Sequence, residues 1–357
     1  MMSLIIILGV VLVLGILYMI FRVSNLLSIA KGTEDEKGGT ANKVNAALFI
    51  VFMVGSFGWF FWYSFAEFHG YTLPVASEHG KRTDTLFWIT MAVTVVAFTI
   101  ISIIMFVFIY RYQYKEGYKA KFFPDNHYLE LAWTIIPAIV LAVLIFTGLR
   151  AWNDITAPAS KDAEVIEVIG QQFAWTVRYP GVKDKTLGKV SYKNIDNFGN
   201  EFGLDMNDKN SFDDFKSLEL HLPVNKEVLL KIRAKDVLHS VFLPHFRVKM
   251  DAVPGMPTQF KFIATMTTQE MREKLHNPNF NYEMACAEIC GRGHFSMKMS
   301  VIVEDEESYE RWKASQDSWL KQNPDYLKKV PANLKEAAMI KAGMEKDPGT
   351  TVAAVKE

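Results

Sequence analysis

The stretch "MACAEICGRGHFSMKM", residues 284–299, holds both cysteines of a chain of 357 residues. His294 follows the second cysteine by four residues, and Met297 follows His294 by three. Two thiols, an imidazole and a thioether in one short loop form a set of soft and borderline donors, which suits copper and does not suit a hard cation. The stretch therefore predicts a copper site in the C-terminal half of the chain.

Cys286 and Cys290 have two other interpretations that the residues alone leave open. A domain outside the membrane lies in a compartment that permits disulfides, so this C-x3-C pair is also compatible with a disulfide. Zinc binds cysteine and histidine as well, but structural zinc usually takes C-x2-C spacing with a second cysteine or histidine pair and has no use for methionine. The thioether of Met297 therefore favours copper over zinc.

The number of thiols bears on the number of copper ions. A mononuclear blue-copper centre needs one cysteine, two histidines and a weak axial methionine, so this loop has one cysteine too many. Two thiolates can instead bridge two copper ions, each of which needs a terminal ligand. His294 offers one imidazole. The candidate for the second is His239, in "DVLHSVFLPHFRVKMDAVPG", although spacing alone leaves His245 open and His221 fits an ordinary strand position.

Four segments without any charged residue precede this domain: 2–21, 46–66, 85–110 and 131–149. Each is about long enough to cross a bilayer core of ~30 Å as a helix. No Lys or Arg precedes the first segment, and its apolar run is longer than that of a typical signal peptide, so we expect a retained helix. The sequence therefore predicts a four-helix membrane half and an aqueous half.

The orientation follows from the positive residues of the short loops, which stay in the cytoplasm. The loops after the first and third segments carry eight, and the loop after the second carries two: Arg22, Lys31, Lys37, Lys43, Arg111, Lys115, Lys119 and Lys121 against Lys81 and Arg82. Both termini are therefore predicted outside, with the aqueous domain in the periplasm. The net charge of zero argues against a nucleic-acid partner, which needs a basic surface.

The aqueous half changes to short runs rich in Val, Ile and Phe, separated by Pro, Gly and Asn. These runs are "EVIEVIGQQFAWTVRY", "SLELHLPV", "EVLLKIRA", "TQFKFIATM" and "KMSVIVED". Such spacing predicts an antiparallel β-sandwich. The tail, residues 307–357, begins as an amphipathic helix and ends in a Pro, Gly and Thr region that we expect to be loose.

An acidic insert, residues 194–215, interrupts the strands. Its charged residues are Asp196, Glu201, Asp205, Asp208, Asp213 and Asp214 against Lys209. The plain interpretation is a solvated polar loop. The other two are a Ca²⁺ site, since hard cations take carboxylate and carbonyl oxygens, and an acidic docking surface for a basic partner. The spacing does not match an EF-hand loop.

At this point the residues carry a family resemblance. "DVLHS", "VKMDAVPG" and "CAEICGRGHFSM" resemble cytochrome c oxidase subunit II, whose binuclear copper A centre uses C-x-E-x-C-x3-H-x2-M with an upstream V-L-H-S. The resemblance covers about residues 85–312, and its copper pattern is highly specific. It implies a cupredoxin-like Greek-key sandwich after a transmembrane helix hairpin. Met256 stands where the family usually has Arg, and we assign that position no role.

The resemblance also implies roles for the residues of the copper pattern. It selects His239 over His245, makes His239 and His294 terminal ligands, and makes Cys286 and Cys290 bridging thiolates. It makes Met297 a weak ligand of one copper and the Glu288 carbonyl that of the other. The Glu288 side chain is expected to face subunit I, where the family places Mg²⁺.

Two further parts of the resemblance concern electrons and protons. "GQQFAWTVRY", residues 170–179, matches the aromatic cluster through which electrons from cytochrome c arrive, with Trp175 and Tyr179 in place but Phe173 where many members have Trp. "HYLELAWTIIPAIV" resembles the second membrane helix of the family, which makes Glu130 a candidate for the mouth of a proton channel. The changed residue suggests a donor fixed in a supercomplex, such as alternative complex III.

We therefore expect four parts: 1–66, two extra transmembrane helices; 67–150, the family hairpin; 151–306, the periplasmic copper A domain; and 307–357, a helical tail. The expected protein is the electron-input subunit II of a bacterial inner-membrane cytochrome c oxidase, an oxidoreductase whose O2-reducing site lies on subunit I. The alternatives are the copper A subunit of a nitric oxide reductase, a membrane-anchored copper-binding protein, and a structural subunit with a disulfide.

Overall fold

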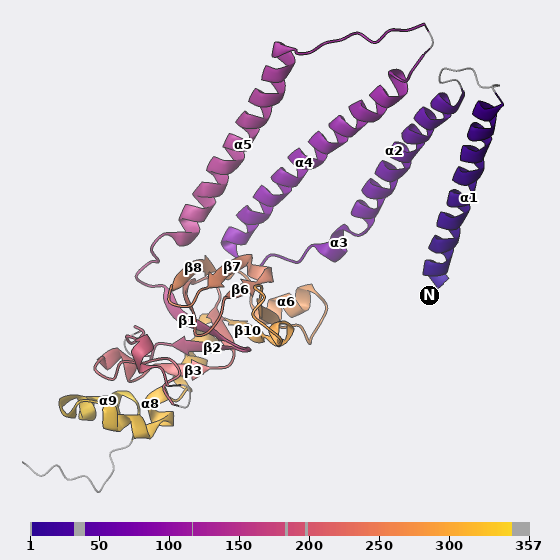
Figure 1. Ribbon diagram of the computed structural model, residues 1–357. Helices are drawn as coiled ribbons and strands as arrows, with labels where there is room; N and C mark the ends of the chain where they lie inside the picture. Colours follow the sequence, from indigo (N-terminus) through magenta and orange to yellow (C-terminus); the bar gives the residue numbers. More distant parts are fainter. Residues whose placement is uncertain (1, 32–39, 116, 183–184, 197–198, 345–357) are drawn as a thin grey trace, which may run out of the picture. The chain divides into compact units, whose positions relative to one another are not determined.

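The computed structural model describes residues 2–31, 40–115, 117–182, 185–196 and 199–344. The chain divides into two compact units, which are Met1–Tyr71 with Met91–Ile136, and Thr72–Thr90 with Pro137–Glu357. The first unit is made of apolar helices, and the second holds the β-sheets (Figure 1). The predicted class, membrane helices followed by a sheet-rich sandwich, is confirmed.

The helical part contains four long helices and a single turn of helix (Figure 1). Their bounds are α1 Met2–Ala30, α2 Thr40–Ala66, α3 Phe68–Tyr71, α4 Glu78–Arg111 and α5 His127–Thr156. The four long ones are apolar enough to cross a membrane, and each exceeds the ~20 residues that a bilayer core requires. A helix satisfies its own backbone hydrogen bonds, which lipid cannot do, so charge-free runs of this length fold in this way.

Ten strands form two five-stranded sheets, with the orders β3-β2-β1-β5-β8 and β4-β10-β9-β6-β7. Their bounds are β1 Glu164–Gln171, β2 Ala174–Tyr179, β3 Phe215–Ser217, β4 Leu220–Pro223, β5 Glu227–Ala234, β6 His239–Leu243, β7 Val248–Ala252, β8 Thr258–Ile263, β9 Tyr282–Cys286 and β10 Lys298–Glu304. Val168 and Val177 of the first sheet share one buried core with Leu222, Val241 and Val301 of the second. The domain is therefore a two-layer sandwich.

The sandwich departs in one respect from the antiparallel sandwich that the sequence predicts. Each sheet contains one parallel pair, β1 with β5 and β4 with β10. Parallel neighbours need a long connection, and the chain supplies it, because the insert lies between β1 and β5, and five strands and the loop after β9 separate β4 from β10. Alternating apolar residues mark a half-buried strand of either direction, so the pattern could not distinguish the two.

Short helices complete the second unit. They are η1 Tyr192–Asn194, η2 Lys209–Ser211, η3 Pro244–Phe246, α6 Thr268–Lys274, η4 His294–Ser296, α7 Glu306–Ala314, α8 Trp319–Gln322, η5 Pro324–Lys329, η6 Ala332–Leu334 and α9 Lys335–Lys341. Of these, α8 and α9 lie within the predicted tail, and α7 begins one residue before it. Its expected loose end falls largely on residues 345–357, which lie outside the described residues.

The acidic insert and the tail share a second hydrophobic core. The insert contributes Phe202, Leu204, Met206 and Phe212, and the tail contributes Trp319, Leu320, Val330, Ala338 and Ala342, all buried. The backbone N–H of Trp319 donates to the carbonyl of Asp214 at 2.7 Å, which joins the two segments directly. The insert is therefore a folded part of the domain, and the expectation of a solvated loop is wrong for its apolar residues.

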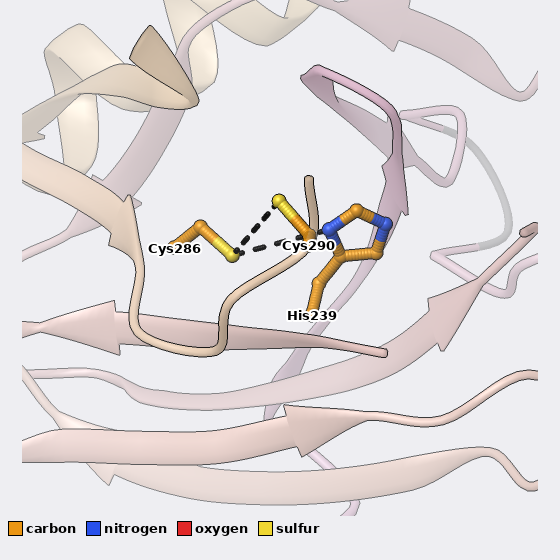
Figure 2. Close-up of side chains that lie close together, drawn as sticks. All are labelled: His239, Cys286 and Cys290. Carbon is orange, nitrogen blue, oxygen red and sulfur yellow. Dashed lines mark hydrogen bonds between the residues drawn. The ribbon is translucent and has the colours of Figure 1, made fainter. Parts of the chain in front are cut away.

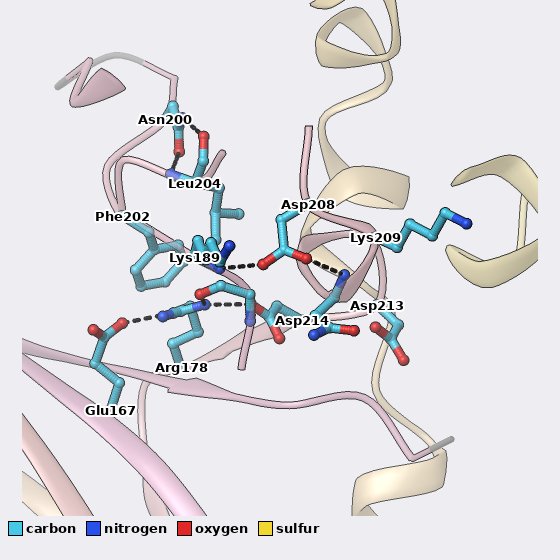
Figure 3. Close-up of polar contacts among 12 residues, drawn as sticks. Glu167, Arg178, Lys189, Asn200, Phe202, Leu204, Asp208, Lys209, Asp213 and Asp214 are labelled. Atoms are coloured by element: carbon cyan, nitrogen blue, oxygen red, sulfur yellow. Dashed lines mark hydrogen bonds and ion pairs between the residues drawn. The ribbon is translucent and has the colours of Figure 1, made fainter. Parts of the chain in front are cut away.

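The carboxylates of the insert have protein partners (Figure 3). Asp214 pairs with Arg178 of β2, whose guanidinium also donates to Glu167 of β1 at 2.6 Å. Asp208 accepts from the backbone N–H groups of Lys189 and Asn210 at 2.8 and 3.1 Å. The Asp214–Arg178 pair ties the insert to the first sheet.

The other acidic side chains of the insert also bond to protein groups. Glu201 pairs with Lys216, Asp213 with Lys341, Asp196 accepts from Tyr326, and Asp205 accepts from Asn207. Within the described residues, the side chains that could share one metal ion are instead those of His239, Cys286 and Cys290. The Ca²⁺ interpretation of the insert therefore gains no support from the structure.

Candidate metal centre

Three segments of the second sheet bring the predicted ligands together. His239 begins β6, Cys286 ends β9, and the pairing of Val241 with Cys286 places these strand ends side by side. The chain then turns through the loop that carries Cys290, forms η4 and enters β10. Strand register therefore fixes one half of the site, and the ligand loop, residues 286–297, supplies the other.

The two sulfur atoms lie at the centre of the donor set, 3.9 Å apart (Figure 2). The Sγ of Cys286 is 3.9 Å from the Nδ1 of His239. The Sγ of Cys290 is 3.7 Å from the Nδ1 of His294 and 3.8 Å from the Sδ of Met297. Each thiol thus has its own imidazole neighbour, and the two halves meet at the sulfurs.

Cys286 and Cys290 are free thiols in this structure. A disulfide holds its sulfurs about 2.05 Å apart, far less than the 3.9 Å found here. The thiol of Cys286 donates instead to the carbonyl of Glu288 at 3.1 Å, so this carbonyl also faces the centre. The geometry therefore matches a chelating site and not the disulfide alternative.

Burial sets the chemistry of this site. His239 is fully buried, and Cys286, Cys290 and Met297 are each at most 8% exposed. Burial, reinforced by the thiol of Cys286, raises the pKa of the Cys290 thiol to about 11. Two buried thiols, the buried imidazole of His239 and the half-buried imidazole of His294 fit a soft or borderline cation, whose charge would favour the thiolate form.

The two rival histidines lie elsewhere. The ring of His221 stacks on Trp312, with centroids 3.8 Å apart, and its Nδ1 is 2.8 Å from Glu304. His245 packs against the rings of Phe280 and Tyr282. Neither has a contact with the two thiols, so the structure places His239 at the site in preference to both.

The three aromatic candidates for receiving electrons differ in exposure. Phe173, between β1 and β2, is 37% exposed, whereas Trp175 is 3% exposed and Tyr179 is fully buried. The ring of Trp175 lies edge-on to that of His239, with centroids 5.8 Å apart. The hydroxyl of Tyr179 donates to the carbonyl of His221 at 2.9 Å. Burial places Trp175 and Tyr179 out of direct reach of an outside donor, so only Phe173 of the three can touch one.

Two carboxylates complete the predicted set. Glu130 lies exposed in the first turn of α5, where the backbone N–H of Asn126 donates to it at 3.5 Å. Glu288 is exposed in the ligand loop between the two cysteines. Neither carboxylate belongs to a cluster of possible metal ligands among the described residues. The structure therefore places both on the surface and gives the Mg²⁺ expectation at Glu288 no support.

Sequence reasoning missed two neighbours of the ligands. Asp236 lies 2.9 Å from the Nε2 of His239, and Gln172 donates from its side chain to the carbonyl of Cys290 at 2.7 Å. The first had a partial signal, since Asp236 is close in sequence to His239 and a carboxylate bonded to a ligating histidine orients its ring. The second had none, because the contact joins segments more than a hundred residues apart.

Comparison with known proteins agrees with this geometry. Residues 164–305 match the family model described as cytochrome C oxidase subunit II, periplasmic domain, and residues 66–151 match the transmembrane domain of the same subunit. The chain is 36% identical to the alternative cytochrome c oxidase subunit 2 of Bradyrhizobium diazoefficiens over 252 residues, which is 69% of this chain and 84% of that protein.

Two other matches are broader or weaker. Cytochrome c oxidase subunit 2 of Thermostichus vulcanus is 30% identical over 270 residues, 69% of this chain and 78% of that protein. The crystal structure of the periplasmic domain of subunit II of cytochrome oxidase of Bradyrhizobium japonicum covers 44% of this chain and 94% of its own, at 23% identity and a TM-score of 0.29, a likeness too low to carry an argument. Taken with the two family models, the sequence matches show that the chain belongs to the cytochrome c oxidase subunit II family of haem–copper oxidoreductases.

Proposed function

We propose that this chain is the electron-input subunit of a haem–copper oxygen reductase and holds a binuclear copper centre. The observation that carries the proposal is the meeting of two thiols, each beside its own imidazole. Cys286 and Cys290 are assigned as bridging ligands, and His239 and His294 as terminal ligands. A mononuclear site would leave one thiol without a role.

The remaining donors complete the two halves. Met297 is assigned as the weak ligand on the Cys290 side, and the carbonyl of Glu288 as that on the Cys286 side, which agrees with their contacts of 3.8 and 3.1 Å to the sulfurs. Copper held by these residues would supply one-electron redox chemistry. The protein buries His239, Cys286, Cys290 and Met297 and would hold and orient the metal through them.

Phe173 is the proposed contact for the electron donor. Its ring is partly exposed. It packs against the ligand loop so closely that a Cβ atom at Gly293 would come within 2.5 Å of it. The donor is a reduced cytochrome c, or a cytochrome c domain of a partner such as alternative complex III. It would give up one electron at a time at this site, and subunit I would take four such electrons, with four protons, to reduce each O2 to two water molecules.

The membrane half is proposed to anchor this domain in a bacterial inner membrane, with the sandwich in the periplasm, as the distribution of Lys and Arg indicates. The long helices expose many large apolar side chains, which suits contact with lipid, with subunit I and with other oxidase subunits. Glu130 is proposed to serve proton uptake, and Glu288 to face a Mg²⁺ at the border with subunit I.

Copper content and electron paramagnetic resonance of the full chain in detergent test the proposal. We expect two copper ions for each chain and a mixed-valence spectrum in which both coppers share one unpaired electron. Cys286→Ser should abolish that spectrum while the domain stays folded by circular dichroism. A folded wild-type chain that takes up no copper after reduction and reconstitution would contradict the proposal, and Cys286 and Cys290 would then be structural.

A further inference from the structure

The tip of the β1–β2 hairpin contacts both halves of the donor cluster through one residue, Gln172. Its backbone N–H donates to the carboxylate of Asp236 at 2.7 Å. Its side-chain Nε2 donates to the carbonyl of Cys290, also at 2.7 Å. Asp236 precedes β6, and Cys290 lies in the ligand loop, so a single hairpin residue joins the segment that carries His239 to the loop that carries the thiols.

Asp236 extends this link to a ligand. One of its oxygens lies 2.9 Å from the Nε2 of His239 and 2.7 Å from the backbone nitrogen of Val237, and the other accepts from Gln172. The Nδ1 of His239 faces Cys286, so a metal bound through Nδ1 leaves a proton on Nε2 for donation to Asp236. Such a hydrogen bond fixes the tautomer and the rotation of a ligating imidazole.

The sequence of the ligand loop leaves room for this contact. A Cβ atom at Gly291 would come within 2.9 Å of the Nε2 of Gln172, and one at Gly293 within 2.5 Å of the ring of Phe173. Gly291 also has a φ of +130°, a backbone conformation that favours glycine. The stretch "CGRGH" is therefore shaped for the close approach of residues 172 and 173.

These contacts differ from those that hold the sandwich together. Gln172 and Asp236 are exposed surface residues, whereas His239 beneath them is fully buried. Hydrogen bonds between exposed groups make only a modest net contribution to folding. Removal of either side chain should therefore leave the domain folded. The ring of His239 and the backbone of Cys290 would then no longer be held in position.

We propose that Gln172 and Asp236 are positioning residues that bind the two ligand segments to one hairpin and so set the geometry of the metal centre. This inference rests on the proposed function. It predicts that the hairpin that carries the electron-receiving ring also fixes the distance from that ring to the ligands. A donor that binds at Phe173 would then contact the same hairpin that holds His239 and Cys290 in position.

The test compares Gln172→Ala and Asp236→Ala with Gln171→Ala in the full copper-loaded chain in detergent. Gln171 is the matched control, because it lies next to Gln172 but its side chain accepts from Lys235 at 3.0 Å and, among the described residues, does not bond to Asp236, His239 or the ligand loop. The measurements are copper content, the electron paramagnetic resonance spectrum, the reduction potential, the rate of copper removal by a chelator, and the melting temperature.

We expect Gln172→Ala and Asp236→Ala to shift the spectrum and the potential and to release copper about 10–100-fold faster than Gln171→Ala, the range seen when partners of metal ligands are removed. Their melting temperatures without copper should stay close to that of the control. If Gln172→Ala does not fold, Gln172→Glu keeps the length of the side chain and removes its donor. A wild-type shared-copper spectrum that both variants retain, with release rates equal to the control, would overturn this inference and leave the proposed function standing. A wild-type chain without that spectrum would overturn both.

Discussion

Lys313 of the tail buries its ammonium group against the carboxylate of Glu164 at the start of β1, with 2.5 Å between Nζ and Oε1. Neither side chain is more than 2% exposed. A charge removed from water in this way is tolerated only with its partner in place. The pair therefore joins α7 to the first strand of the sandwich, at a distance from the metal centre along the chain.

The first prediction follows from this pair. Lys313→Ala should lower the stability of the domain by about 3–5 kcal/mol, because it leaves the Glu164 carboxylate buried and unpaired. Thermal unfolding of the full chain in detergent measures the loss. The double variant Lys313→Met with Glu164→Leu should recover most of it, and a single variant as stable as wild type would contradict the argument.

A second prediction concerns acid. Burial alone acts to raise the pKa of Glu167, but the guanidinium groups of Arg178 and Arg233 outweigh it and hold the pKa below its ordinary value of 4.5. The stability that this carboxylate contributes is therefore present above about pH 4.5 and is lost as the pH falls through the lower pKa of the folded state. Melting temperatures between pH 7 and pH 3 should fall more steeply for wild type than for Glu167→Gln. Parallel curves would show that Glu167 does not carry the effect.

The second core gives a third prediction. Trp319 is 1% exposed and packs among apolar residues of the insert and the tail, so Trp319→Ala should cost about 3–5 kcal/mol. Tyr192→Ala is the matched control, since this aromatic side chain of the same region is 77% exposed. Limited proteolysis should then cut the insert of the Trp319 variant first. Equal protection of the two variants would argue against a shared core.

The ligand loop gives a fourth prediction. Gly293→Ala would place a Cβ atom 2.5 Å from the ring of Phe173, so the loop and the hairpin must separate. We expect weaker copper retention in Gly293→Ala, measured with a chelator, and partial recovery in the double variant with Phe173→Ala. Failure of the second change to recover retention would show that the strain lies in the loop itself.

The last prediction concerns the membrane half. In the assembled oxidase, Glu130→Ala should slow steady-state O2 consumption and proton uptake, while the copper spectrum stays that of wild type. Glu130→Asp, which keeps the carboxylate in the first turn of α5, serves as its control. An unchanged turnover rate in the alanine variant would remove Glu130 from the proton path.

The sequence was most informative where a pattern is local. Charge-free runs predicted the four long helices. The loop from Cys286 to Met297 holds four of the side chains proposed as metal ligands within a short span. His239 could be singled out only through the family resemblance, because strand register, and not spacing, brings it beside Cys286.

Contacts between distant segments were the part that could not be predicted. The parallel pairing of β1 with β5 follows from the path of the chain and leaves the alternation of residues unchanged. The acidic insert looked solvated because its charges dominate its composition, whereas Phe202 and Phe212 bury against the tail. The bond from Gln172 to Cys290 likewise depends on where a hairpin tip falls in space.

The shared core of insert and tail has a consequence for biosynthesis. The ammonium group of Lys341 donates to the carbonyl of Lys209, 132 residues earlier in the chain, at 2.9 Å. The insert is therefore synthesised before its packing partner, and its apolar residues lack that partner until residues 319–342 have been made. A nascent chain that stalls before residue 319 would present an unfinished domain to chaperones and proteases.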